Sequence, residues 1–147
     1  MAISQCLPTS FKVDLLSGQQ NFSALSGGPN TFKIALYTSS ATLDATTTSY
    51  TGTTNEVTGT GYTAGGATLS ISVAPTYSGT TAYISFANAT WSASTITARG
   101  ALIYNNTLAG KNAVAILDFG SDKSTIASTF TIVFPTADAT NAVIRIP

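Results

Sequence analysis

Carboxyl groups are the side chains of this 147-residue sequence that are best suited to acid–base chemistry, and there are six of them. Glycoside hydrolysis needs two carboxyl groups that face one cleft with different pKa values, but no pair of the six is marked by spacing or neighbours. The sequence has no histidine and one cysteine, Cys6, which we expect to be an unpaired, unreactive thiol. Ser-His-Asp triads, Cys-His dyads and most zinc sites are thereby excluded, so we expect no enzyme, no cofactor and no metal.

Two acids, Asp118 and Asp122, are close enough in sequence to share a Ca²⁺ ion, which prefers several oxygen ligands. Their surroundings fall well short of an EF-hand loop. The segment is more typical of a turn after a strand, with Gly120 at a positive φ and Asp122 bonded to local backbone.

The glycine-rich run Gly59–Gly66 (GTGYTAGG) invites comparison with phosphate-binding loops. Such a loop needs a following helix, or a lysine followed by serine or threonine, and neither is present. The run therefore predicts a flexible hairpin or a bulge.

Four ring side chains are candidates for stacking on a sugar: Tyr62, Tyr77, Trp91 and Tyr104. A single tryptophan and scattered tyrosines more often complete a β-sheet core. A carbohydrate site requires that these rings be exposed and coplanar.

The composition and the apolar pattern exclude two kinds of partner, nucleic acid and a membrane. Only 8% of the residues are charged, the formal net charge is zero and the pI is near 6.0, so no basic surface is available for nucleic acid. No apolar run approaches the roughly 20 residues that cross a membrane. The chain is nevertheless 44% hydrophobic with a mean hydropathy of +0.25, which favours a folded domain over disorder.

The first thirty residues differ in pattern from the rest, and we expect them to form a helical or extended arm (residues 1–30). Thr9 or Ser10 is expected to cap a helix over residues 9–18 that Gly18 ends. Phe11 and Leu15 share one face of this helix. A helix this short must pack against something else.

From Thr31 onward, apolar residues recur with the period of two that is typical of strands. The candidate strands are 31–38, 69–73, 82–86, 95–104, 113–119, 128–134 and 141–146. Seven or eight short strands with half-polar faces predict an all-β fold, an antiparallel, jelly-roll-like β-sandwich over residues 31–147 with a short N-terminal helix.

The stretch Ser39–Thr68 has few large side chains and is longer than most loops. One short strand near Glu56–Thr58 is expected to interrupt it. The stretch is either a contact arm at one end or edge of the sandwich or a flexible surface loop.

Several segments resemble small virion proteins of tailed bacteriophages: Asn30–Thr38, Asn55–Gly66, Ile96–Tyr104 and Ala113–Gly120. The resemblance runs through nearly the whole chain. It implies a structural role on a virus particle, and it carries no catalytic residues.

We therefore expect a capsid decoration (cement) protein that is made in the bacterial host cytoplasm and binds the outside of the phage head. Its expected partners are the major capsid protein and copies of itself, as a homotrimer that matches threefold positions of the capsid. A tail fibre, head fibre or adaptor, or a carbohydrate-binding module, are the alternatives. The residues expected to make the contacts are Phe11, Leu15, Phe22, Tyr50, Glu56 and Tyr62.

Overall fold

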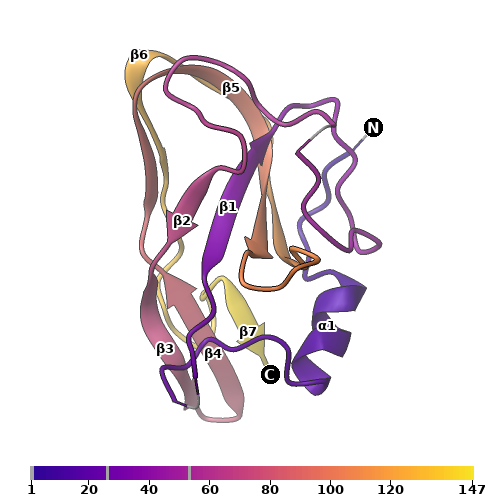
Figure 1. Cartoon of the computed structure of the whole chain (residues 1–147). Helices are drawn as coiled ribbons and strands as arrows, with labels where there is room; N and C mark the ends of the chain where they lie inside the picture. The colour runs from indigo at the N-terminus through magenta and orange to yellow at the C-terminus, as the bar shows by residue number, and fades with distance from the viewer. Residues whose placement is uncertain (1, 26, 53) are drawn as a thin grey trace.

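One short helix and seven strands make up the computed structural model over the residues that it describes, 2–25, 27–52 and 54–147 (Figure 1). Residues 1 and 26 of the expected arm, and residue 53 of the stretch 39–68, lie outside the described part. The elements are α1 (Thr9–Leu16), β1 (Phe32–Tyr37), β2 (Ala67–Leu69), β3 (Ile71–Ser78), β4 (Thr81–Phe86), β5 (Ala89–Asn105), β6 (Ala113–Ile132) and β7 (Ile144–Ile146).

The strands form two antiparallel sheets, one of four strands in the order β2-β1-β5-β6 and one of three in the order β3-β4-β7. In the first sheet Phe32 lies opposite Asn105, and in the second Ile84 lies opposite Ile144. The prediction of an all-β antiparallel sandwich with one short N-terminal helix is confirmed.

The last long strand differs from the prediction. The sequence predicts separate strands at 113–119 and 128–134 with a turn between them, whereas β6 is continuous over 20 residues. Gly120, at φ 75°, forms a bulge instead of a turn, and the pairing with β5 shifts there. Gly120 has the predicted positive φ, but the carboxylate that bonds to local backbone is Asp118, which accepts the Gly120 N–H, and not Asp122.

The helix ends as predicted but begins differently. Gly18, at φ 70°, donates its N–H to the carbonyl of Leu15, and the Gln19 N–H bonds to Asp14, which is the Schellman arrangement. Pro8 occupies the N-cap position and no side chain caps the helix, so the prediction of a Thr9 or Ser10 cap is wrong. No helix in the described residues is long and apolar enough to span a membrane.

The main core lies between the two sheets and contains residues from the expected N-terminal arm. Phe11 is fully buried and Phe22 is 8% exposed. The ring of Phe22 stacks on that of Phe32 with centroids 4.5 Å apart, and Phe86 packs edge-on against the ring of Phe22. Residues 11–22 therefore complete the core that β1 and β4 begin.

A second layer covers the outer face of the four-stranded sheet. Ala35 and Tyr37, whose side chains point away from the main core, are buried with Ala41 and Leu43 of the stretch 39–68 and with Ile3. Both faces of β1 are consequently buried, which is why its burial does not alternate as its sequence predicts.

Candidate interaction sites

Three of the residues expected to contact a partner meet around one buried carboxylate. Oε2 of Glu56 accepts a hydrogen bond from the hydroxyl of Tyr50 at 2.8 Å. Oε1 accepts bonds from the hydroxyl of Tyr62 and from the Gly65 N–H, each at 2.7 Å. Glu56 is only 9% exposed, and three donors of its own chain bind its carboxylate.

Further tyrosines surround this carboxylate. Tyr104 stacks on Tyr50 with centroids 4.5 Å apart and donates its hydroxyl to the carbonyl of Gly65 at 2.8 Å. Tyr37 donates to the carbonyl of Thr51. Burial, followed by the charge of Glu56, raises the pKa of Tyr104 to about 12. Burial and the same carboxylate also raise the pKa of the Tyr37, Tyr50 and Tyr62 hydroxyls.

The hydrogen bonds of the Glu56 cluster fix the stretch 39–66 against the sheet. Tyr62 also accepts the Leu36 N–H of β1 at 2.9 Å, and Val57 donates its N–H to the carbonyl of Leu36. Gly66 lies so close to β1, at φ 72°, that an added Cβ would collide with the Ile34 carbonyl. The described part of this stretch thus packs closely on the four-stranded sheet. The glycine-rich run allows the close approach, because Gly66 has no side chain.

The other three expected contact residues lie in or against the core. Phe11 and Phe22 are buried within it, 6.2 Å apart between ring centroids, and Leu15 is half-buried against it. None of the three side chains presents a large surface to a partner. Their neighbours Val13 and Leu16 on α1 are 57% and 92% exposed, and Leu25 is 78% exposed.

These exposed residues lie on the segment that borders a small apolar hollow. The hollow has a volume of about 310 Å³ and lies between residues 15–23 and the sheet β3-β4-β7. Its lining includes Leu15, Phe22, Pro75, Ile84, Ile144 and Ile146. We refer to Val13, Leu16, Leu25 and this hollow together as the α1 surface.

A buried polar network that the sequence does not reveal holds the helix in place. Oδ2 of Asp14 accepts hydrogen bonds from Gln20 at 3.1 Å and from Asn112 at 2.8 Å. Asn105, at the end of β5, donates to Gln20 at 2.9 Å. Isolated polar residues this far apart in sequence carry no detectable pattern, so no sequence signal pointed to them.

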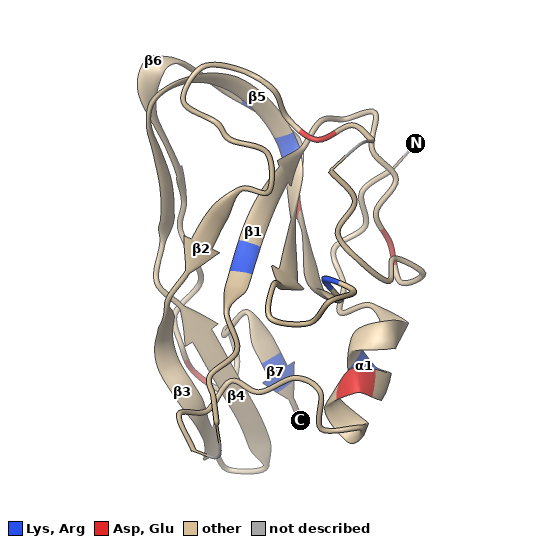
Figure 2. Ribbon diagram, in the orientation of Figure 1, with Lys and Arg blue, Asp and Glu red and all other residues tan. Residues whose placement is uncertain are grey.

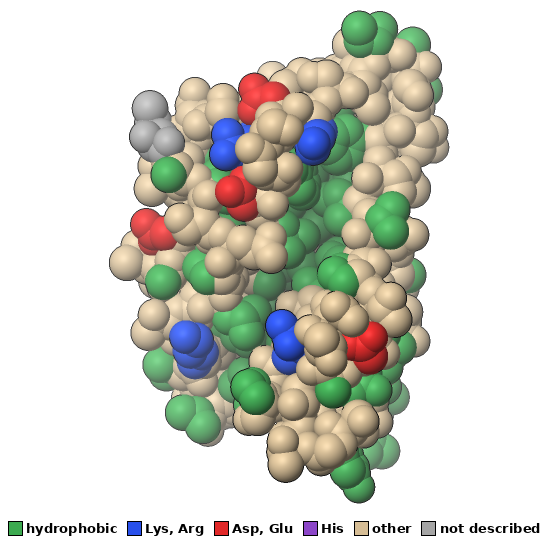
Figure 3. Space-filling view, turned by 180° about the vertical axis from the view of Figure 1, so that it is seen from behind, with side chains coloured by type: hydrophobic (Ala, Val, Ile, Leu, Met, Phe, Trp, Pro, Cys, Tyr) green, Lys and Arg blue, Asp and Glu red, His purple; other side chains and the backbone are tan. Residues whose placement is uncertain are grey.

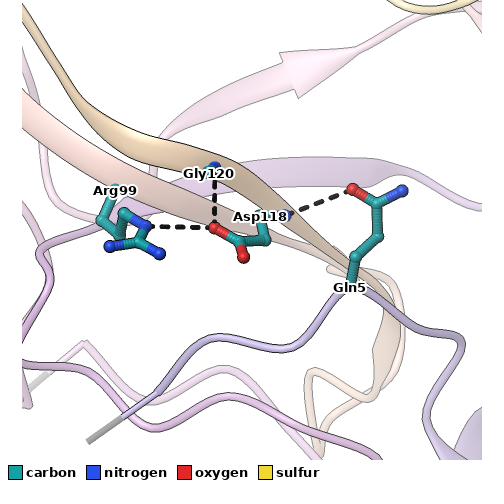
Figure 4. Close-up of polar contacts among 4 residues, drawn as sticks. All are labelled: Gln5, Arg99, Asp118 and Gly120. Atoms are coloured by element: carbon teal, nitrogen blue, oxygen red, sulfur yellow. Dashed lines mark hydrogen bonds and ion pairs between the residues drawn. The ribbon is translucent and has the colours of Figure 1, made fainter.

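The candidate calcium ligand Asp118 is engaged elsewhere (Figure 4). Its Oδ1 lies 3.1 Å from Nε of Arg99 and accepts the Gly120 N–H at 2.9 Å, while its own N–H bonds to Gln5. The Gly120 N–H, followed by Arg99, lowers the pKa of this carboxyl. The described residues contain no group of three histidine, cysteine or acidic side chains that could hold a metal ion.

The rings that are candidates for stacking on a sugar do not form an exposed platform in the described residues. Trp91 is 6% exposed and lies at an angle of 34° to the half-buried Tyr62. Tyr104 is 1% exposed. Tyr77 is 76% exposed, but the other three rings are buried or half-buried and do not form a surface with it. The feature required for a carbohydrate-binding module is therefore missing from these four residues.

A larger groove lies beside β6, on the face seen from behind in Figure 3. It has a volume of about 860 Å³ and is bordered by residues 5–7, by both halves of β6 and by residues 141–147. The apolar part of its lining includes Leu7, Leu117, Phe119, Phe130, Ile132 and Phe134. We call this feature the β6 groove. The sequence does not predict it, because it depends on how β6 bends.

Charged side chains are few and widely separated over the fold (Figure 2). The ion pair found among the described residues is that between Arg99 and Asp118. Long-range electrostatic attraction of a charged ligand is therefore weak.

Comparison with known proteins identifies no relative of this chain. No protein-family model matches the chain, and neither the curated proteins nor the solved structures provide a significant match.

Proposed function

We propose that this chain is a non-enzymatic structural protein of a phage virion, a capsid decoration protein that binds the outside of the head and stabilises it. The proposed partners are the major capsid protein and copies of the chain in a homotrimer. The resemblance of its segments to phage virion proteins supports this role. A neutral, charge-poor surface also suits an interface that packs by shape, because it avoids the desolvation of unpaired charge.

The α1 surface is the observation that carries the proposal. On α1, Leu16 is 92% exposed and Val13 57% exposed, and Leu15 of the same helix lines a hollow that is mainly apolar. Burying one such side chain against a partner contributes about 1.5–3 kcal/mol. Exposed apolar side chains that gather on one segment are typical of an interaction site.

The use of the acidic residues supports a role other than catalysis. Five of the six carboxylates accept hydrogen bonds from their own chain, and these are Asp14, Asp44, Glu56, Asp118 and Asp138. The sixth, Asp122, is exposed. Five of the six carboxylates are thus engaged as hydrogen-bond acceptors within the fold.

The test is to bind the purified chain to phage heads that lack it. Leu16→Glu is expected to weaken binding at least tenfold, because it places a charge where an apolar contact forms; tenfold corresponds to about 1.4 kcal/mol. The thermal unfolding temperature should stay unchanged. Ile126→Glu is the matched control, since Ile126 is 82% exposed on β6, away from the α1 surface. Co-sedimentation with the heads measures both variants.

Bound copy number separates the decoration role from the alternative roles. Hundreds of copies per head are expected for decoration, whereas roughly six to a few dozen would indicate a fibre or adaptor at a symmetry axis. Equal binding of the Leu16→Glu and Ile126→Glu variants would remove the α1 surface as the contact, and failure of the unaltered chain to bind heads would contradict the decoration role itself.

A further inference from the structure

The outer edge of β6 is largely unpaired. On one side β6 pairs with β5 along its length. On the other side, Ile116 exchanges backbone hydrogen bonds with Cys6, at 2.9 and 3.2 Å, and the Asp118 N–H bonds to the side chain of Gln5. From Phe119 to Ile132, no described residue pairs with this outer edge. Residues 5–6 of the chain thus occupy the first positions beside this edge, and the rest of the edge has no partner strand among the described residues.

The direction of the free backbone groups follows from one contact. The Phe134 N–H points to the β5 side, where it donates to Oδ1 of Asn88 at 3.1 Å. Because successive residues of a strand alternate in direction, Val133 and Thr131 direct their N–H and C=O groups to the open edge. Both side chains are exposed, and Val133 is 70% exposed.

The volume of the β6 groove fits one short extended segment. In a packed sandwich a residue of a strand occupies about 160 Å³, from a rise of about 3.3 Å, a strand spacing of about 4.8 Å and a sheet spacing of about 10 Å. The 860 Å³ of the groove therefore hold about five extended residues. Leu7, Leu117 and Phe119, which are half-buried at the groove, offer apolar contacts to such a segment.

The shape of the groove selects the occupant. Both halves of the bent strand β6 border it, and residues 141–147 close one side. The volume of about 860 Å³ holds a single strand and not the several strands of a second copy's sheet. Side chains of both charges lie above and below the hollow in Figure 3, and the basic residues that line the groove are Lys123 and Arg145. Asp118 also lines it but is paired with Arg99, and Arg145 lies near the Asp138 carboxylate. Lys123 is therefore the cation that favours an acidic residue on the segment.

We propose that the β6 groove binds a single extended segment of another protein, which adds a strand to the open edge at residues 129–133, the last four residues of β6 and Val133 after them. The segment has apolar side chains at alternate positions and an acidic residue at an end. Backbone hydrogen bonds to Thr131 and Val133 provide affinity, and the apolar lining selects the alternating side chains, as in other strand-addition complexes. This binding does not depend on the capsid role or on the α1 surface.

The test uses a library of random linear seven-residue peptides selected on the immobilised full chain. Selected peptides are expected to alternate apolar and polar residues and to carry an acidic residue near one end. In the unbound protein, the Thr131 and Val133 amides should exchange rapidly with solvent. A saturating selected peptide should slow that exchange at least tenfold.

Thr131→Pro and Thr131→Ala form the matched pair of variants. Proline removes the N–H that faces the open edge and is tolerated at edge positions, whereas alanine keeps the N–H. Thr131→Pro should weaken binding of a selected peptide at least tenfold, and Thr131→Ala less than threefold. Lys123→Glu should weaken peptides that have an acidic end but not their neutral analogues.

Three results would overturn the inference: a library that yields no binding peptide, unchanged amide exchange at residues 131 and 133 on peptide binding, or equal binding by the two Thr131 variants. If Thr131→Pro unfolds, the exchange measurement on the unaltered chain decides. Binding to phage heads is measured separately, so failure of the head assay contradicts the decoration role and leaves the peptide result standing.

Discussion

Glu56 shows how one residue can organise a long irregular segment. Its carboxylate receives the hydroxyls of Tyr50 and Tyr62 and the N–H of Gly65, all from the stretch that covers the outer face of the sheet. A carboxylate is the suitable acceptor because it has no hydrogen to place among three donors. The residues expected to bind a partner thus bind one another.

Glu56→Gln is expected to lower the free energy of unfolding by about 1–3 kcal/mol, because the glutamine NH₂ group faces donors and leaves at least one of them unpaired. Urea unfolding followed by tyrosine fluorescence measures the change. Asp122→Asn, at an exposed position, is the control and should change stability by less than about 0.5 kcal/mol. An equal effect of the two substitutions would mean that the Glu56 hydrogen bonds do not stabilise the fold.

Alkaline pH should destabilise the protein through Tyr104. Its pKa is near 10 in the unfolded chain and raised to about 12 in the fold, so above pH 10 the unfolded state loses a proton that the folded state keeps. The contribution of Tyr104 to stability is complete below pH 10 and is lost between about pH 10 and 12, by up to about 1.4 kcal/mol per pH unit.

Unfolding curves of the unaltered chain and of Tyr104→Phe between pH 9 and 12 test this loss. The phenylalanine variant should show the shallower decline. A phenolate absorbance difference between the two folded proteins that appears already near pH 10 would contradict the raised pKa.

Among the elements, α1 connects the N-terminal segment to the main core. Phe11 lies in that core, and Asp14 joins the helix to the end of β5 through Gln20 and Asn105. Leu16, two residues after Asp14 on the same helix, is almost fully exposed. One short helix therefore has a structural side and a side available for binding.

Phe11→Ala should lower the free energy of unfolding by about 3–5 kcal/mol, because it leaves a cavity in the core. Leu16→Ala, at the exposed position, should change it by less than about 0.5 kcal/mol.

Deleting residues 1–28 removes Phe11 and Phe22 together and should leave a largely unfolded chain. Circular dichroism and chemical unfolding test all three; a truncated chain that unfolds cooperatively would show that the sandwich is stable without the segment.

The strands were predictable where polar and apolar residues alternate, as in β1 and β4. The continuity of β6 was not, since its middle is rich in serine and threonine and its bulges include Ala127 at φ 45°, a conformation that alanine does not signal. For the candidate sites, the sequence singled out Tyr50, Glu56 and Tyr62 but not their meeting point. That point, like the β6 groove, depends on contacts between segments that are distant in the sequence.

For the molecule as a whole, few charges are available for long-range attraction. Twelve charges sum to zero, and Arg99 and Asp118 form the ion pair of the described residues. Binding to phage heads should therefore change by less than about threefold between 50 and 500 mM sodium chloride, over which electrostatic attraction is strongly screened. Co-sedimentation at several salt concentrations measures this dependence, and a tenfold or greater loss at high salt would indicate a charged contact.

The pairing of Cys6 with Ile116 also constrains the order of events during synthesis. The strand that receives residues 5–6 leaves the ribosome about 110 residues later, which at about 5–20 residues per second is roughly 5–20 s. Through that interval residues 5–6 lack their β6 partner, and the partners of Ile3 and Phe11 that have already been made are Leu43 and Phe22. The native fold must therefore form after most of the chain has been made, and contacts of such long range favour slow folding. Nascent chains of this protein should accordingly be candidates for chaperone binding before β6 emerges.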